Sequence, residues 1–200
     1  MNRLVRSLKS FGACLVLFAA MTGAAWAADL SEAVILVASD RLAGSIYEQT
    51  VILAAPLPQG GHLGFIINRP THVKLETLFP QQPSTRNVAD PVYAGGPVLS
   101  NAVFAVTRKA PDNNGNNGNN GNFFSPIPGL VVVIDAATVD RIIETTPNDA
   151  RYFVGLMFWA PDDLEDEIRN GAWEVRPADV DTVLRANSTG LWKSLEGPMV

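Results

Sequence analysis

Two histidines, His62 and His72, are the only imidazoles in the 200-residue chain, and they limit any proton-transfer chemistry. A serine triad would need one of them, yet the sequence has no Gly-x-Ser-x-Gly elbow to present a nucleophile. Two histidines at this spacing hold no metal unless the fold adds carboxylates. We therefore expect surface or turn histidines, no catalytic residue, no metal site and no cofactor. A hydrolase that uses His62 or His72, with acids supplied by the fold, is the alternative.

A dense group of carboxylates lies between residues 162 and 167, where every residue except Leu164 is acidic. Metal binding or general acid–base chemistry is conceivable for such a group. However, acids in a first turn, Arg169 near the end and Gly171 as a C-cap all suit the dipole of a helix. We favour a solvated helix over residues 162–170.

Two short blocks, Gly64–Pro70 and Asp90–Pro97, are apolar, strand-like runs that each end in residues typical of a sharp turn. In the first block, Arg69 could pair bidentately with a carboxylate ligand. In the second, two glycines before a proline allow the backbone to approach another group closely, or to hold an anion on exposed amides. The alternatives are an internal ion pair for Arg69 and a tight turn between two strands.

Trp159 ends an apolar run, where its indole either packs in the core with a partnered N–H or stacks on a ligand. The blocks and this tryptophan together supply the candidate ligand- or partner-binding residues. These are Asn68, Arg69, Pro70, Gly95, Gly96, Pro97 and Trp159.

The elements that must position these residues alternate between strands and short helices. Continuous apolar runs rich in β-branched residues predict buried strands. The predicted strands cover residues 33–38, 50–55, 62–68, 102–107, 130–134, 152–159 and 172–175, the second and third forming a hairpin. Apolar residues at helical spacing predict helices over 73–79, around Val139, Ile142 and Ile143, over 162–170, around 180–184 and around 191–195.

Residues 112–122 form a low-complexity run of Asn and Gly within the domain. Such a run buries too little apolar area to offset its ordering entropy, so we predict a flexible surface loop. A calcium loop is the alternative that starts at Asp112. It lacks the required glycine, because Asn117 takes that position, and the final glutamate, because Phe123 takes it.

The first 27 residues are typical of a secretory signal peptide. Arg3, Arg6 and Lys9 precede an apolar run that ends in a small-x-small pattern at Ala27. A membrane anchor is the alternative, but the run is shorter than the roughly 20 residues of a spanning helix. We expect cleavage after Ala27, which also removes the lone Cys14, no stable membrane span, and a periplasmic or secreted protein.

The mature chain, residues 28–200, is long enough for one domain with a sizeable core. Removal of the three basic residues in the leader leaves 12 Lys and Arg against 20 Asp and Glu, a formal charge of −8. An acidic surface repels phosphate backbones, so we expect no nucleic-acid partner.

The order and spacing of these motifs resemble the YqgE/AlgH family across almost the whole mature chain. The resemblance begins at Leu36–Ala38 and runs through both turn-ending blocks. It resumes at Ala150–Leu156, Trp159 and Asp163–Ile168, and closes on Asn170–Trp173 and Pro177–Asp179. The signal peptide, the Asn/Gly run and the Phe158-Trp159-Ala160 sequence, where members often have Gly-Trp-Gly, depart from the family pattern.

The resemblance implies a single α+β domain whose bifurcated, mostly antiparallel sheet forms a pseudo-barrel flanked by short helices. It brings no established catalytic residue or cofactor, although some members carry the label of transcriptional regulator. We therefore predict an exported, non-catalytic binding or interaction module of the cell envelope, with an unknown protein or small molecule as partner. A regulator, acting directly or indirectly, and the histidine-dependent hydrolase are the alternatives.

Overall fold

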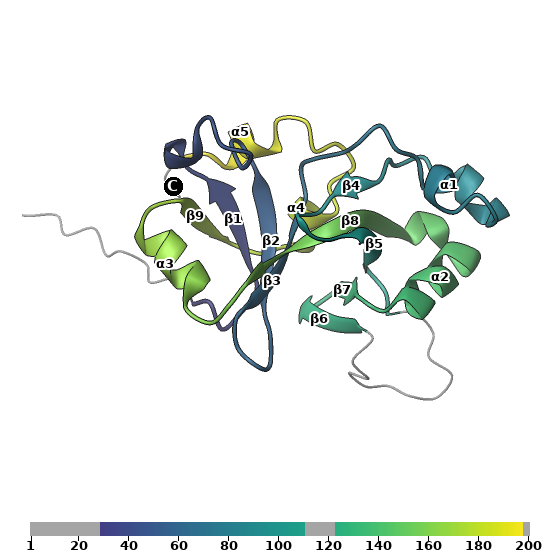
Figure 1. Ribbon diagram of the computed structural model, residues 1–200, viewed down its shortest axis with the longest axis horizontal. Coiled ribbons are helices and arrows are strands. Elements are labelled where there is room, and N and C mark those ends of the chain that lie inside the picture. The colour runs from purple at the N-terminus through teal and green to yellow at the C-terminus, as the bar shows by residue number, and fades with distance from the viewer. Residues whose placement is uncertain (1–28, 111–122, 198–200) are drawn as a thin grey trace, which may run out of the picture.

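A single curled sheet carries the fold in the computed structural model, which describes residues 29–110 and 123–197 (Figure 1). The strands are β1 (Val34–Ala38), β2 (Val51–Pro56), β3 (His62–Ile66), β4 (Tyr93–Ala94), β5 (Val98–Thr107), β6 (Phe123–Ile127), β7 (Leu130–Val133), β8 (Ala150–Trp159) and β9 (Trp173–Pro177). The α-helices are α1 (Leu75–Leu78), α2 (Ala136–Thr145), α3 (Asp163–Arg169), α4 (Val180–Val183) and α5 (Leu191–Leu195). Short 3₁₀ helices are η1 (Asp40–Leu42), η2 (Pro83–Asn87) and η3 (Pro147–Asp149).

The sheet forks along β8, a central strand of ten residues. The strand order is β6-β7-β5-β8-β3-β2-β1-β9, and all neighbours in this order are antiparallel. Residues 150–156 of β8 pair with β5, whereas residues 157–159 pair with β3 on the opposite edge. The two-residue strand β4 adds the one parallel pairing, beside Phe153 and Val154 of β8. This is the bifurcated, mostly antiparallel sheet that the family resemblance implied.

The inner side of the curl holds the largest core cluster. Phe65 lies at its centre, with ring centroids 5.0 Å from Phe153 and 5.8 Å from Phe104. Val183 of α4 and Leu191 of α5 close this cluster, so the C-terminal segment covers the inner side of the sheet. Burial of these large side chains contributes roughly 2 kcal/mol each before entropy is counted.

The outer side is covered in two separate parts. Near one end, α2 packs Val139, Ile142 and Ile143 against β5 and β7, as the helical spacing predicted. At the other end, α3 packs Leu164 beside the buried indoles of Trp159 and Trp173. Figure 1 shows α3 and α2 at opposite ends, with β8 crossing between them.

The strand and helix predictions agree with most of the structure, including the β2–β3 hairpin. Several details differ. Strand β5 begins at Val98 rather than at residue 102, β3 ends at Ile66 rather than at residue 68, and β8 begins at Ala150 rather than at residue 152. Strand β9 extends to Pro177 rather than to residue 175, and β6 was not predicted. Strand β6 contains Pro126, which an edge strand tolerates because its outer N–H groups need no partner.

Two predictions fall outside the described residues: the signal peptide of residues 1–27 and the Asn/Gly run of residues 112–122. Within the described ranges, no helix is both long and apolar enough to cross a membrane.

Candidate functional site

The two turn-ending blocks lie side by side. The amide of Ile66 donates to the carbonyl of Gly95, and the amide of Ala94 donates to the carbonyl of Arg69, each at 2.9 Å. An isolated bridge pairs Pro70 with Tyr93. The sequence placed these blocks apart, and the sheet brings them together next to β8.

Gly95 and Gly96 pack directly on the backbone of β8. A Cβ atom at Gly96 would lie 2.3 Å from the carbonyl carbon and oxygen of Leu156, which no side chain tolerates. The amide of Gly95 donates to the carbonyl of Val154 at 2.8 Å, so it is not exposed for an anion. The connection from β4 to β5 crosses β8 and is not a tight turn between neighbouring strands, because β4 and β5 both pair with residues 153–154 of β8 and so lie on its opposite edges.

Asn68, Arg69 and Pro70 line a cavity of about 480 Å³ between the end of β3 and α5. We call it the Arg69 cavity; its other polar and aromatic walls include Glu48, Trp192 and Lys193. Arg69 donates a single long hydrogen bond, 3.3 Å from its Nη2 atom to the carbonyl of Glu48. Among the described residues, no carboxylate lies within ion-pair distance of Arg69.

Asn68 holds the backbone at this cavity. Its Oδ1 accepts from the amide of Val51 at 2.9 Å, and its Nδ2 donates to the carbonyl of Gln49 at 2.8 Å. Gln49 itself has a φ of 57°, a left-handed conformation that costs a non-glycine residue roughly 1–2 kcal/mol. Asn68 therefore acts as a structural clamp, with both ends of its amide in use.

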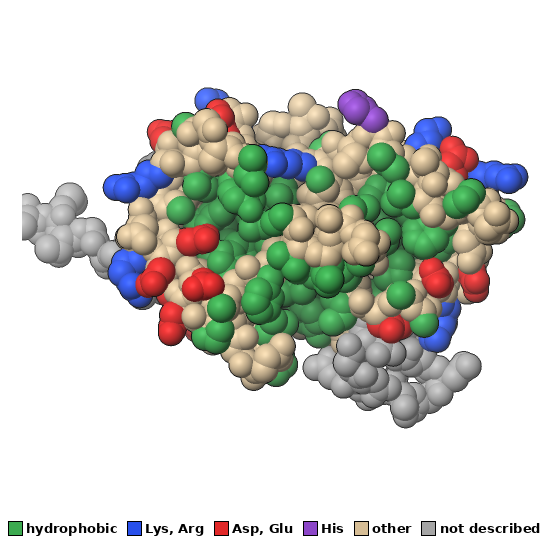
Figure 2. All heavy atoms as spheres, viewed as in Figure 1, with side chains coloured by type: hydrophobic (Ala, Val, Ile, Leu, Met, Phe, Trp, Pro, Cys, Tyr) green, Lys and Arg blue, Asp and Glu red, His purple; other side chains and the backbone are tan. Residues whose placement is uncertain are grey.

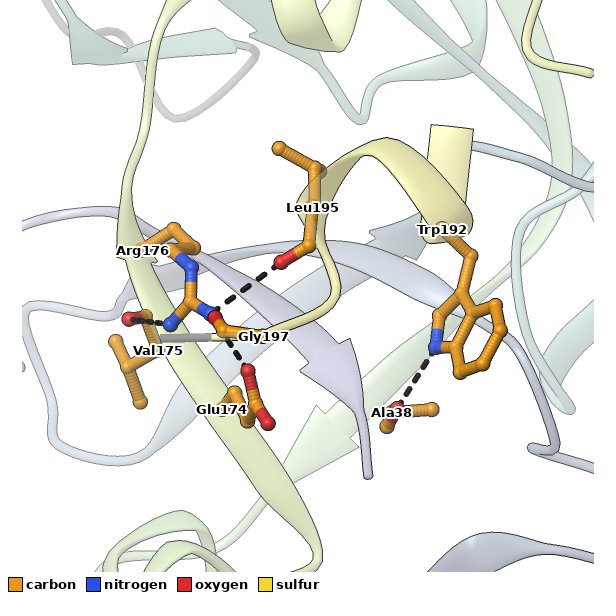
Figure 3. A network of polar contacts seen from close by, with 7 residues as sticks. All are labelled: Ala38, Glu174, Val175, Arg176, Trp192, Leu195 and Gly197. Carbon is orange, nitrogen blue, oxygen red and sulfur yellow. Dashed lines mark hydrogen bonds and ion pairs between the residues drawn. The ribbon is translucent and has the colours of Figure 1, made fainter. Parts of the chain in front are cut away.

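The opposite wall of the Arg69 cavity comes from α5, which several long-range hydrogen bonds fasten to the sheet (Figure 3). The indole of Trp192 donates to the carbonyl of Ala38 at 2.7 Å. Arg176 of β9 donates to the carbonyls of Leu195 and Gly197 and pairs with Glu174. The sequence predicted a last turn or two here, but nothing local indicated that Trp192 and Lys193 would face Arg69.

Pro97 and Trp159 lie at a different place, where β5 leaves β8. They line a groove of about 570 Å³ at the fork of the sheet, together with Tyr47, Val98, Met157 and Phe158. We call it the fork groove. Carboxylates of α3 also line it, namely Asp163, Asp166 and Glu167.

The indole of Trp159 is 3% exposed, and its N–H is partnered, which confirms core packing for this residue. One oxygen of Glu167, Oε2, accepts from Trp159 at 3.0 Å and from Trp173 at 2.6 Å. The predicted helix of the acidic stretch is also confirmed as α3. Its remaining acids are mostly exposed, and Asp166 pairs with Arg169 one turn on.

The histidines do not form a shared centre. His62 lies buried in β3, and its Nε2 is 3.0 Å from the carbonyl of Leu30, so the prediction of a surface or turn histidine is wrong at this position. His72 is exposed after β3. In the parts of the chain that the structure describes, no cluster of three or more His, Cys, Asp or Glu residues could hold a metal.

Two buried polar groups away from the predicted residues serve the core. Burial, with a smaller contribution from Asp149, raises the pKa of Tyr152 far above its usual value, and its hydroxyl donates to the carbonyl of Pro147. The guanidinium of Arg151, 4% exposed, donates to the carbonyls of Val183 and Arg185. Arg151 directly precedes the apolar run of residues 152–159, a position that was the sequence signal for such a clamp.

A third cavity of about 670 Å³ contains none of the predicted residues. It lies between the β2–β3 connection at Pro56–Gln59 and the edge strand β6. Its walls mix apolar side chains, such as Phe123 and Phe124, with polar ones, such as Glu32 and Ser125.

A family model described as DUF179, AlgH-like, matches residues 35–198. A UPF0301 protein of Streptomyces coelicolor is 26% identical over 161 residues, which covers 80% of this chain and 82% of that protein. A UPF0301 protein of Thermobifida fusca is 29% identical over 152 residues, covering 74% and 76%.

Two solved structures share the fold. A protein of Corynebacterium diphtheriae gives a TM-score of 0.65 at 25% identity and covers 84% of this chain and 88% of its own. The solution structure of the AlgH protein of Pseudomonas aeruginosa gives a TM-score of 0.61 at 19% identity, covering 86% and 97%. The curled sheet described above is thus common to these proteins.

Proposed function

This chain belongs to the AlgH-like family, and on that premise we propose that it is an exported, non-catalytic binding module of the cell envelope. The basic and apolar leader with its small-x-small site at Ala27 supports export. Burial of His62 against the carbonyl of Leu30 supports a structural role for that imidazole rather than a catalytic one. The formal charge of −8 on the mature chain opposes a nucleic-acid partner.

One observation carries the proposal: β8 has an open edge at the fork. Residues 157–159 pair with β3 on one side, and the last pairing of β5 with β8 on the other side is Val98 with Leu156. Within the described ranges no strand pairs with that second edge of residues 157–159. Unpaired backbone N–H and C=O groups on such an edge can accept an added strand from another chain.

Apolar side chains gather at this fork. Val98, Leu99 and Phe158 are 40%, 56% and 51% exposed. Leu99 also has a φ of 52°, a conformation that costs a non-glycine residue roughly 1–2 kcal/mol and is concentrated at functional sites. Figure 2 shows hydrophobic side chains across the middle of this view, with acidic side chains near α3.

The occupant we propose is an extended segment of a partner protein that carries both basic and apolar residues. The apolar side chains would fill the fork groove, and its backbone would pair with β8. Asp163 and Asp166 line the same groove. Helix α3 contains only one basic residue, Arg169. Complementary charge would steer a basic segment to this place and fix its register.

Photo-crosslinking in the native host tests this proposal. A benzophenone amino acid replaces Phe158, and the matched control replaces Leu78, an apolar residue of α1 that is 38% exposed. We expect an adduct at position 158 alone, whose peptide contains Lys or Arg beside apolar residues. Equal adducts at both positions, an acidic peptide, or a second copy of this chain as the adduct would contradict the proposal.

Variants that remove acidic side chains test whether charge on α3 steers the partner to the fork groove. The double change Asp163→Asn with Asp166→Asn should reduce the yield at position 158 severalfold. Its matched control removes two exposed carboxylates from α2 instead, by Asp140→Asn with Glu144→Gln. An unchanged yield in the first variant, or an equal loss in both, would remove the charge argument.

Export is tested separately by fractionation of the host and intact mass of the recovered protein. We expect a periplasmic or secreted chain that starts at Ala28. An uncleaved chain in the cytosol would overturn the export proposal and restore the regulator hypothesis.

A further inference from the structure

We propose that the Arg69 cavity binds the carboxylate of a small organic acid, with Arg69 as the principal donor. This site is independent of the fork groove and lies between the end of β3 and α5. Its volume of about 480 Å³ falls in the range of ordinary small-molecule sites.

The Arg69 cavity carries positive charge that has few partners within the protein. Arg69 and Lys193 both line the cavity. The guanidinium of Arg69 makes one contact of 3.3 Å, to the carbonyl of Glu48, which leaves most of its fork of donors available for an anion. Lys193 pairs at 3.4 Å with Glu196, an exposed contact that a ligand carboxylate can replace or share.

The carboxylate that lines the cavity is already in use. Oε2 of Glu48 accepts from the amide of Gly44 at 2.8 Å, within its own loop. This hydrogen bond holds the acid in the segment before β2. A second acid to neutralise Arg69 is absent among the described residues that line the cavity, so an external anion fits the charge of this site.

The backbone that carries Arg69 and the facing wall of the cavity are held in place before any ligand arrives. The carbonyl of Arg69 accepts from the amide of Ala94 at 2.9 Å, and the neighbouring Asn68 clamps two backbone groups of the β2 segment. On the facing wall, Trp192 is tied to Ala38. A preorganised site avoids part of the entropy cost of binding, which favours small ligands.

The walls also define the rest of the ligand. Pro70 and Trp192 offer apolar and aromatic surface beside the two cations. A carboxylate on a short apolar or aromatic body therefore matches the cavity better than a compact inorganic anion. The same carboxylate could come from a free organic acid or from the C-terminus of a peptide, and the experiment separates these sources.

Isothermal titration of the protein recovered from host fractionation tests the site. The first probe is 4-phenylbutyrate, and its neutral amide is the matched control ligand. We expect a Kd of about 1 mM for the acid, in the range for so small a ligand, and no measurable binding of the amide. Equal binding of acid and amide would overturn the proposal.

Protein variants assign the binding to Arg69. Arg69→Ala should weaken the acid by about tenfold or more, and Arg69→Lys by about threefold, because lysine keeps the charge but loses the bidentate fork. Arg86→Ala removes an exposed arginine from η2 and should leave the Kd unchanged. An unchanged Kd in Arg69→Ala, or the same loss in Arg86→Ala, would overturn the assignment.

Two further arms complete the test. Acetyl-glycyl-phenylalanine with a free carboxylate, compared with its C-terminal amide, shows whether a peptide terminus binds more tightly than the free acid. If it does, the C-terminus is the source of the carboxylate. Circular dichroism checks that Arg69→Ala is folded, and Arg69→Gln replaces it if it is not. Neither arm depends on the crosslinking at Phe158, so the two proposals can fail separately.

Discussion

The two turn-ending blocks share a pattern, an apolar run that ends at a proline, but have different roles in the structure. The block that ends at Pro70 presents side chains to a cavity, with Asn68 clamping the backbone and Arg69 left with donors to spare. The block that ends at Pro97 buries its glycines against β8 and leaves only the proline at the fork groove. They pair with each other, yet they open onto different sites.

The difference lies in what each block brings close to its neighbour. Asn68 contacts the backbone of Gln49 and Val51 through hydrogen bonds of its side chain. Gly96 brings backbone against backbone, so nothing larger than hydrogen fits between it and Leu156. A glycine pair before a proline therefore indicated close packing here, and an arginine at a strand end indicated an open site.

Gly96→Ala should give the largest effect, because the new Cβ would sit 2.3 Å from backbone atoms of Leu156 that cannot move aside. We expect a loss of about 4 kcal/mol or more in the free energy of unfolding, the range of severe core clashes. Urea unfolding followed by tryptophan fluorescence measures it.

The matched control is Gly190→Ala. Gly190 has a φ of 71°, but no heavy atom lies within 4 Å of the position that a Cβ atom would take there. Alanine at this position should therefore cost only about 1 kcal/mol of backbone strain. A Gly96→Ala variant that loses no more stability than this control would show that the two blocks do not differ in packing.

Asn68→Ala should be next in size. It leaves the buried amide of Val51 without its acceptor and the carbonyl of Gln49 without its donor. The expected loss is about 2 kcal/mol in urea unfolding, since the buried amide of Val51 pays its desolvation cost, whereas the exposed carbonyl of Gln49 can bond to water. Asn187→Ala, which removes an exposed hydrogen bond to Thr189, is the control and should cost below about 0.5 kcal/mol. Similar losses in both would deny Asn68 its role as a clamp.

Much of the fold was predictable because most of its strands and helices have a recognisable local sequence pattern. The apolar run predicted as a strand over residues 152–159 lies within β8, and the predicted stripe of Val139, Ile142 and Ile143 is the buried face of α2. Strand β6 has no such pattern, because its five residues include a proline and lie at the sheet edge. The burial of His62 depends on the backbone of Leu30, a distant contact that no local pattern reveals.

The site was predictable only in part, for the same reason. Arg69 and Pro97 follow from turn chemistry, but the facing wall of the Arg69 cavity comes from Trp192 and Lys193 at the other end of the chain. The fork groove depends on where β5 leaves β8, and the pairing of these two strands is irregular between Val98 and Val103. Long-range pairings of this kind assemble both sites, so sequence reasoning found single residues and not their surroundings.

Glu167→Gln should have a smaller effect that is confined to the fork groove. One carboxylate oxygen accepts from two indoles, and a neutral amide oxygen accepts more weakly from both. The expected loss is about 1 kcal/mol in unfolding, with a shift in tryptophan emission. Asp166→Asn, which removes an exposed pairing with Arg169, should cost less than about 0.5 kcal/mol and leave the emission unchanged. An unaltered emission in Glu167→Gln would mean that the shared oxygen does not hold the indoles.

Arg69→Ala should have the smallest effect on stability, and this is what separates the two blocks most sharply. The side chain loses one 3.3 Å hydrogen bond to a backbone carbonyl, so the free energy of unfolding should fall by less than about 0.5 kcal/mol. Urea unfolding of Arg69→Ala and Asn68→Ala in parallel compares the stability effects of two neighbouring residues. If Arg69→Ala cost as much as its neighbour, the guanidinium would be part of the scaffold, and the argument that its donors await an anion would fail. A stable Arg69→Ala protein that no longer binds 4-phenylbutyrate would instead assign this arginine to the ligand, just as the fixed Gly96 is assigned to the sheet.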